Sequence, residues 1–329
     1  MRVIEINQKD EWERMRHDIN SVDLYTSWTW SEYKKRQGWD VKHYALVSDV
    51  ANKVISLFIL KIRRLTFFKI ALIQGGLEMS EVDDKYYAAT EAILETISSQ
   101  KIDMTIFQGG HRHNPRLLLA LLRSKFQTVS HLRRQTLILK GLSELSMMHR
   151  LTKNWRHNLK RSMREDVLNV KEMIGFDDRK FALQILASMY DELAERRSFP
   201  KSIDIRLMQD LLVQDSQFTI LVAYDSGKIV AVRVGYFDGG CGLDFLAAST
   251  EGAVKNYANY RLLWELIKSG ANSGVLEFDC GGIDPSGNVG VFNFKKGLGG
   301  DFHMYDSLLA YAPKKWKLRL ARIAFGLFH

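Results

Sequence analysis

The stretch Phe278–Gly300, FDCGGIDPSGNVGVFNFKKGLGG, lies near the C-terminal end of the sequence and decides the fold. Val275–Asp279 is a short apolar run bounded by glycines, which predicts a buried strand. A loop rich in glycine, aspartate and proline follows, and Val289–Lys296 is typical of a short helix. Glycines at such a strand end let the backbone approach a ligand closely, so we expect a binding or catalytic site here.

Two lysines end this short helix. Lys295 and Lys296 follow Phe294 and precede a second glycine-rich turn. A lysine beside an aromatic ring in a partly dry cleft is a strong point charge for a phosphate or a developing oxyanion. We therefore take Lys295 and Phe294 as candidate catalytic residues, and Gly281 and Gly282 as candidate substrate-binding positions. From the residues alone, a surface turn with two solvated lysines remains an equal alternative.

Composition places the chain among globular proteins with a basic surface. It has 329 residues, 46% of them hydrophobic, and a net charge of +9, which allows two domains and fits a polyanionic partner or an anionic membrane. Cys241 and Cys280 lie in apolar, strand-like settings, so we expect buried free thiols. Without a Cys-x-x-Cys pair or a Cys/His cluster, no zinc site is expected.

The two ends of the sequence bear on location. The start, MRVIEINQKDEWERM, is charged throughout and does not resemble a signal peptide, and no apolar run approaches the ~20 residues that span a bilayer. We therefore expect a cytoplasmic protein. The basic tail KKWKLRLARIAFGLFH can form an amphipathic helix that lies on the inner membrane face. Packing of this tail on the first domain is the interpretation that we favour.

One order of elements occurs in both halves of the chain. Strands are expected at 41–47, 54–63, 67–74, 102–107 and 127–139, with helices at 86–98 and 115–125. In the second half, strands are expected at 217–224, 229–237, 241–247, 275–279 and 303–311, with helices at 254–268 and within 289–297. A duplicated β-β-β-α-β-α-β plan explains both halves. This is the plan of the GNAT-type N-acyltransferase fold.

A basic helix is expected between the halves. The segment His149–Arg164 has no acidic residue and carries six cations, namely Arg150, Lys153, Arg156, Lys160, Arg161 and Arg164. Apolar residues recur every four positions and predict a buried stripe of Leu151, Trp155, Leu159 and Met163. We take Arg156, Lys160 and Arg164 as candidates for contacting the phosphates of a tRNA backbone, a nucleotide or a polyprenyl diphosphate. A solvated face is the alternative.

The residues at the strand end and its helix resemble those of the Fem family of peptidoglycan bridge aminoacyltransferases. The family pattern is roughly (Y/F)DFGGI, a spacer and FKxGFGG, and this chain has FDCGGI and FKKGLGG, with Cys280 and Leu298 as departures. Ser27–Trp39 resembles the family's QS-x-x-W…K…W segment, with Thr26 where Gln is common. Residues 151–170 provide a third, weaker match. Together these matches span nearly the whole chain.

The resemblance implies an α/β fold with mixed sheets, arranged as two tandem GNAT-like domains. Their expected ranges are 1–141, completed by the tail 312–329, and 142–311. The activity implied is transfer of an amino acid from aminoacyl-tRNA to an amine of a nucleotide- or lipid-linked peptidoglycan precursor, with no cofactor and no metal. Because this chain lacks the coiled-coil arm of the larger family members, its tRNA contacts must come from the basic face.

The resemblance also assigns roles to individual residues. It makes Lys295 the cation near the reacting ester or the adjacent tRNA phosphate, with Phe294 shaping the pocket. Lys34 can reach a substrate phosphate, although a solvated lysine is an equal alternative. Trp30 can stack on a sugar or a base, but a position in the core of an amphipathic helix is favoured.

The sequence also bears on the identity of the acyl donor. A coenzyme A enzyme of this fold needs a loop of the form R/Q-x-x-G-x-G/A, whose small residues let backbone N–H groups reach the diphosphate. The corresponding segments read KNYANY at Lys255–Tyr260 and VDDKYY at Val82–Tyr87, and neither fits well. This favours tRNA as the carrier. A CoA-dependent acyltransferase acting on surface polysaccharide or lipid-linked sugars, and a non-catalytic binding protein of envelope assembly, remain as alternatives.

Overall fold

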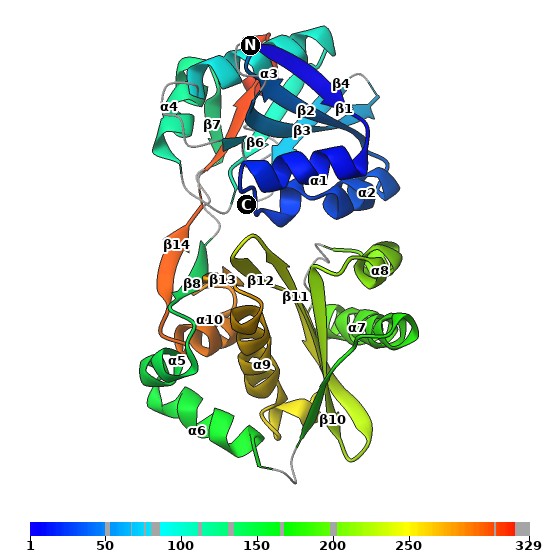
Figure 1. The fold of residues 1–329 in the computed structure, drawn as a ribbon, viewed down its shortest axis with the longest axis vertical. Helices are drawn as coiled ribbons and strands as arrows, with labels where there is room; N and C mark the ends of the chain where they lie inside the picture. Colours follow the sequence, from blue (N-terminus) through cyan, green and yellow to red (C-terminus); the bar gives the residue numbers. More distant parts are fainter. Residues whose placement is uncertain are drawn as a thin grey trace. The chain divides into compact units, whose positions relative to one another are not determined.

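The computed structural model describes residues 1–49, 53–66, 68–75, 77–79, 86–110, 114–130, 135–164, 168–197, 203–305 and 307–319. The chain forms two compact units, Met1–Arg134 with Met304–His329 and Gln135–His303. Each unit is built on its own mixed sheet (Figure 1), which confirms the predicted α/β class. Two parts of the chain discussed above lie outside the described residues. They are residues 82–85, which belong to the segment Val82–Tyr87 that was compared with a CoA loop, and the tail beyond Arg319.

The sheet of the first unit contains strands from both ends of the chain. Its spatial order is β1 (Arg2–Ile6), β2 (Asp40–Val47), β3 (Val54–Leu65), β4 (Phe68–Gln74), β6 (Met104–Gln108), β15 (Leu308–Tyr311) and β7 (Gln127–Ser130), with β5 (Glu78–Met79) paired to β3. The helices are α1 (Lys9–Asp18), η1 (Leu24–Thr26), α2 (Trp28–Arg36), α3 (Tyr86–Ser99) and α4 (Pro115–Arg123). Only β4 and β6 run parallel among the described pairs.

Strand β3 is apolar over most of its length because both of its faces are covered. Phe58 and Leu60 belong to the core beneath α3 and α4, whereas Leu57 and Ile59 belong to the core that contains Trp12 of α1. Successive side chains of a strand point to opposite faces of the sheet. A continuous apolar run therefore marks a strand buried on both sides.

The second unit has the same plan. Its sheet runs β14 (Asp301–Met304), β8 (Gln135–Lys140), β13 (Glu277–Ile283), β12 (Cys241–Ser249), β11 (Lys228–Asp238), β10 (Phe218–Asp225) and β9 (Asn169–Glu172). Its helices are α5 (Glu144–Arg150), α6 (Lys153–Ser162), α7 (Phe176–Arg197), α8 (Ile205–Gln214), η2 (Gly252–Val254), α9 (Ala258–Asn272) and α10 (Val289–Lys296). Helices α7 and α9 lie on opposite sides of strands β10 to β12 (Figure 1).

The single strands expected at 127–139 and 303–311 are wrong in the same way. Each is two short strands that belong to different sheets: β7 and β15 lie in the first sheet, β8 and β14 in the second. The chain leaves one sheet and enters the other between the two members of each pair. As a result β8 lies between β13 and β14, and β15 lies between β6 and β7.

This exchange of strands moves the division of the chain away from the expected positions. The expected limits were 141 and 311, whereas the compact units divide after Arg134 and after His303. In the described part of the tail, Leu318 is buried with Val129 and Ala310 of the first unit. Each unit is thus completed by a strand from the opposite half of the sequence.

Candidate active site

Strands β12 and β13 pair only at their beginnings. The parallel pairing joins Cys241–Leu243 to Glu277–Asp279, and both strands then continue without pairing to each other. The expected strand end at Asp279 is wrong, because β13 continues to Ile283. Strand β8 provides the pairing there, with Thr136 opposite Gly282 after a shift in register. The two glycines therefore lie inside a strand, at the place where the parallel pairing has ended.

A buried carboxylate fixes the bend in β13. Asp279 is almost fully buried, and its Oδ1 accepts a hydrogen bond of 2.7 Å from the backbone N–H of Gly281. The hydroxyl of Thr136 on β8 bonds to the same carboxylate and lies 2.8 Å from the carbonyl oxygen of Gly281. These contacts satisfy a buried charged group locally. Asp279 therefore positions the glycines.

The two glycines differ in what they require. Gly281 has φ of +75°, and a Cβ there would lie 2.9 Å from the carbonyl oxygen of Asp244 and 3.3 Å from Nζ of Lys295. A Cβ on Gly282 would meet no atom within 4 Å. Only Gly281 is therefore needed for the close approach of β12, β13 and α10.

Helix α10 directs Lys295 at this strand. The helix begins after Asn288, whose Oδ1 accepts the N–H of Val291, and it ends at Gly297. Lys295 is half-buried, and its Nζ donates a hydrogen bond of 2.9 Å to the carbonyl oxygen of Gly282. Lys296 is exposed, and its Nζ lies 5.7 Å from the ring centre of Phe292. The two lysines thus have different surroundings, and only Lys295 contacts the glycine strand.

Buried charges surround the ammonium of Lys295. Burial lowers the pKa of Lys295, and the nearby carboxylate of Asp244 opposes this shift. Asp244 forms an ion pair of 2.9 Å with Arg233, and the two side chains are 7% and 5% exposed. Oδ1 of Asp244 is buried and has no hydrogen-bond partner among the described residues. The carboxylate of Asp244, with one oxygen uncommitted, therefore favours the charged form of the half-buried ammonium electrostatically.

The neighbouring thiol is poorly suited to act as a nucleophile. Cys280 is fully buried, and burial raises its pKa well above the ordinary value, with a further contribution from Asp244. The thiolate is the reactive form of cysteine. Cys280 and Cys241 are both buried and outside any disulfide, as the sequence predicted.

Phe294 joins α10 to α6. Its ring centre lies 4.9 Å from that of Tyr260 and 5.9 Å from that of Trp155, and its carbonyl oxygen accepts the indole N–H of Trp155 at 3.0 Å. A Cβ on Gly297 would lie 2.7 Å from Cδ1 of Trp155, so the helix can pack here only with a glycine at that position. In this structure, Phe294 holds α10 in place.

The predicted buried stripe of α6 is confirmed at Leu151, Trp155 and Leu159, whereas its fourth member, Met163, is only half-buried. Its cations are not equivalent. Arg156 is half-buried, and its Nη2 donates to the carbonyl oxygen of Leu151 at 3.1 Å. The other two candidates, Lys160 and Arg164, are exposed, and so is Lys153 at the start of the helix. A polyanion can therefore be contacted by these three, whereas Arg156 caps the end of α5.

Two tyrosines occupy the start of α9. Tyr257 precedes the helix with φ of +58°, and its hydroxyl accepts a hydrogen bond of 2.9 Å from Arg161. The ring of Tyr260 lies edge-on to Trp155 at 5.0 Å. A CoA diphosphate requires small residues at this helix start so that backbone N–H groups can reach it.

The candidates Trp30 and Lys34 lie in the first unit, on α2. Trp30 is only 4% exposed, and its indole N–H donates to Oε1 of Gln74 at 3.0 Å. Lys34 is half-buried, with its Nζ 2.8 Å from Oε1 of Gln37 and 5.1 Å from the ring centre of Trp30. Trp30 therefore has the core position that the sequence favoured.

The sequence analysis missed a buried lysine beside this pair. Lys61 on β3 is fully buried, and its Nζ donates to the carbonyl oxygen of Tyr25 at 2.9 Å. Burial and the neighbouring Lys34 lower the pKa of Lys61 to about 7, while Asp23 opposes the shift. The available signal was a lysine inside the apolar run FILKI, at a position that faces the core.

The candidate site residues fall in two different units of the structure. Lys295, Gly281 and Gly282 meet in the second unit, and Phe294 connects them to α6 through Trp155. Trp30 and Lys34 belong to the first unit. Within the described ranges, no group of three or more histidine, cysteine or acidic side chains could hold a metal ion. No helix in the same part of the chain is long and apolar enough to cross a membrane.

Comparison with known proteins agrees with this architecture. Residues 150–296 match the family model described as an acetyltransferase (GNAT) domain. Among solved structures, FemX covers 98% of this chain and 100% of its own, with 14% identity and a TM-score of 0.79. A protein of Agrobacterium fabrum described as the C-terminal domain of a lysylphosphatidylglycerol synthetase covers 96% and 95%, with 12% identity and a TM-score of 0.62.

A tandem GNAT protein from the clavulanic acid biosynthesis pathway covers 94% and 98%, with 9% identity and a TM-score of 0.56. No curated protein matches the chain. At these identities the solved structures establish the fold, which is a tandem pair of GNAT-like units. The matched GNAT domain places the protein among acyltransferases.

The different surroundings of the two glycines give a matched test. Gly281→Ala places a Cβ in the left-handed region and against two neighbours, so we expect a loss of about 1–2 kcal/mol in the free energy of unfolding. Gly282→Ala should change this free energy by less than about 0.5 kcal/mol. Urea unfolding of both variants measures the difference. Equal stability of the two variants would contradict the packing described here.

The buried Lys61 predicts a dependence of stability on pH. Its pKa of about 7 in the folded state lies below the ordinary value of 10.5, so between these pH values the unfolded chain binds more protons. The cost of burying the charged form is fully present below pH 7 and declines as the pH rises. Stability relative to Lys61→Met should therefore increase by at most about 1.4 kcal/mol per pH unit.

Urea unfolding at pH 7, 8 and 9 measures this slope for the parent protein and for Lys61→Met. The exposed Lys296→Met is the matched control and should keep the slope of the parent protein. If the parent protein and Lys61→Met have parallel pH profiles, Lys61 does not titrate in this range.

Proposed function

We propose that the protein transfers an amino acid from aminoacyl-tRNA to an amine of a peptidoglycan precursor, as in the formation of interpeptide bridges. The observation that carries the proposal is the half-buried ammonium of Lys295, held at Gly282 where the pairing of β12 and β13 has ended. The similarity of the fold to FemX over nearly the whole chain supports the same reaction class.

The chemistry needs no nucleophile from the protein. The acceptor amine attacks the ester carbonyl of the aminoacyl group, so that a C–N bond forms and the C–O bond to the ribose breaks. The proton lost by the amine goes to the departing ribose oxygen. The raised pKa of Cys280 agrees with a direct transfer that bypasses a thioester.

Lys295 stabilises the charge that develops on the carbonyl oxygen. A donor fixed in a partly desolvated position is worth more than one in water, because it needs no reorganisation during the reaction. The carboxylate of Asp244 favours the protonated form of Lys295 against the effect of burial. Aligning the amine with the ester provides the rest of the acceleration.

Features of α6 and α9 bear on the nature of the acyl donor. Tyr260 lies where a CoA diphosphate would require a small residue, and it packs edge-on against Trp155. The exposed cations Lys153, Lys160 and Arg164 form a surface suited to successive phosphates of a nucleic acid backbone. Both features favour tRNA as the acyl carrier, and we place the reaction in the cytoplasm.

One observation favours a second candidate. The family model that matches residues 150–296 describes an acetyltransferase domain. An acyl-CoA donor acting on an amine of surface polysaccharide or lipid-linked sugars would use the same Lys295 and the same direct attack.

The role of Lys295 predicts a large effect on turnover. Lys295→Met should lower the rate of amino acid transfer by about 10²- to 10³-fold, as does the loss of one oxyanion donor. The adjacent and exposed Lys296→Met is the matched control and should have a much smaller effect. Similar small losses in both variants would show that the glycine strand and its lysine serve only the fold.

The basic surface predicts how the donor binds. Lys153→Glu, Lys160→Glu and Arg164→Glu combined should weaken tRNA affinity and reduce its dependence on salt, because fewer counterions are released. Arg156 is left intact because its capping role would confuse binding with stability. Calorimetry with acetyl-CoA should give no saturable heat at sub-millimolar concentration. Stoichiometric acetyl-CoA binding with unchanged tRNA affinity would select the acyl-CoA candidate instead.

A further inference from the structure

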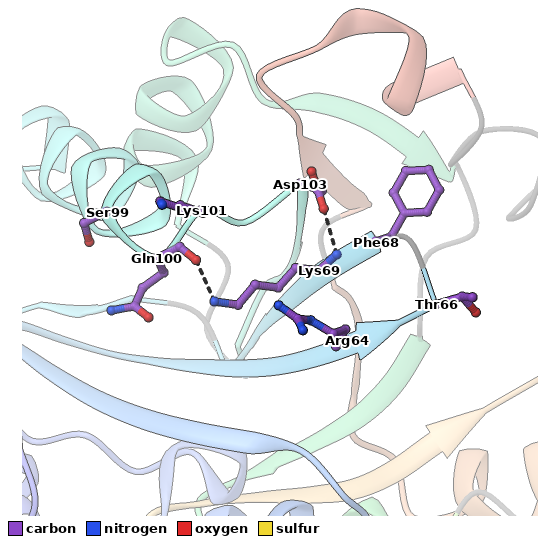
Figure 2. Close-up of a pocket in the computed structure, with 8 residues that line it drawn as sticks. All are labelled: Arg64, Thr66, Phe68, Lys69, Ser99, Gln100, Lys101 and Asp103. Carbon is purple, nitrogen blue, oxygen red and sulfur yellow. Dashed lines mark hydrogen bonds between the residues drawn. The ribbon is translucent and has the colours of Figure 1, made fainter.

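The first unit has an open pocket at the end where β3 turns into β4 and α3 ends (Figure 2). Its volume is about 540 Å³, and Arg64, Lys69 and Lys101 are among its lining residues. In Figure 2 the side chains of Arg64 and Lys69 extend into the same space. Lys69 is held in place, because its Nζ donates to the carbonyl oxygen of Gln100 at 2.6 Å.

The acidic residue of this pocket is already neutralised. Asp103 accepts the backbone N–H of Lys69 at 2.8 Å and bonds to the ammonium of Lys317, and these hydrogen bonds lower its pKa. Arg64 and Lys101 are exposed and form no ion pair within the described residues. The pocket therefore presents uncompensated positive charge.

The C-terminal tail enlarges this positive surface. Lys317 anchors the tail to Asp103, the ring of Trp316 lies edge-on to Phe68 at 6.0 Å, and Leu318 is buried. The exposed cations beside these anchors are Lys314, Lys315 and Arg319. The tail thus packs on the first unit and still adds cations to the same end of it.

Two large apolar side chains lie among these cations. Trp316 is 51% exposed, and Leu65, at the end of β3, is 47% exposed. We define the basic tip as Arg64, Leu65, Lys101, Lys314, Lys315, Trp316 and Arg319. An exposed tryptophan flanked by lysine and arginine is the composition found at membrane interfaces.

We propose that the basic tip binds the surface of an anionic phospholipid bilayer. Its cations attract the headgroup phosphates, and Trp316 with Leu65 enters the boundary between headgroups and acyl chains. A nucleic acid backbone would use the cations but would leave Leu65 and half of Trp316 in water. The apolar residues therefore favour a membrane over RNA.

Docking would bring the first unit to the lipid surface. This fits a lipid-linked acceptor better than a free nucleotide-linked one, an extension that rests on the proposed function. The docking itself does not depend on it, because vesicle binding needs neither donor nor acceptor. Failure of one proposal can thus be distinguished from failure of the other.

Sedimentation with vesicles tests the basic tip in the full-length protein. Binding is expected to vesicles of phosphatidylcholine with one-third phosphatidylglycerol, and is expected to be weak to phosphatidylcholine alone. Lys314→Glu with Lys315→Glu should lower the affinity at least tenfold. Trp316→Ser should lower it several-fold even at low salt, where charge attraction is strongest.

The control removes the same charge from the second unit. Lys180 and Lys228 are exposed there, and their combined change to Glu should leave vesicle binding intact. Equal losses in the control and in the Lys314/Lys315 variant would overturn the proposal by making net charge the cause. The proposal would also be overturned if the protein did not bind vesicles, or if the tip variants weakened tRNA binding and left vesicle binding unchanged.

Discussion

The site depends on the pairing of β8 with β13. Without β8, β13 would end at Asp279, where its parallel pairing with β12 stops. Strand β8 extends it through the glycines, and Thr136 on β8 bonds to Asp279 beneath them. Gly281 is thereby held close enough to Asp244 and Lys295 to exclude any side chain. A strand contributed by the first half of the sequence thus shapes the site of the second unit.

The carboxylate of Asp244 opposes the effect of burial on the ammonium of Lys295. A buried ion pair such as Arg233 with Asp244 contributes little net stability, because desolvation offsets most of the attraction. Its role here is to hold the carboxylate of Asp244 in position. Arg233 binds one carboxylate oxygen of Asp244 and leaves the other without a hydrogen bond, and the charge of Asp244 opposes the lowering of the pKa of Lys295 by burial. The pair thus fixes a carboxylate whose charge favours the protonated form of Lys295.

Most elements could be predicted because their sequence patterns depend on local burial. The continuous apolar run of β3 indicates a strand buried on both faces, and the apolar stripe of α6 indicates the one face of the helix that is buried. The division of 127–139 into β7 and β8 could not be predicted, since the assignment of the two pieces to different sheets depends on partner strands that are distant in the sequence. Lys61 and Arg233 were missed for the opposite reason, because each is a charged residue within an apolar pattern.

Net charge alone could not separate the two basic surfaces of this protein. The +9 of the chain is compatible with a nucleic acid and with a membrane. The side chains beside the cations distinguish them. On α6 the aromatic Trp155 is buried beneath the cations, whereas on the basic tip Trp316 is half-exposed among them. Binding of phosphates requires only the cations, whereas binding to a bilayer is also strengthened by an exposed apolar side chain that can enter it. The same charge therefore favours different partners in the two units.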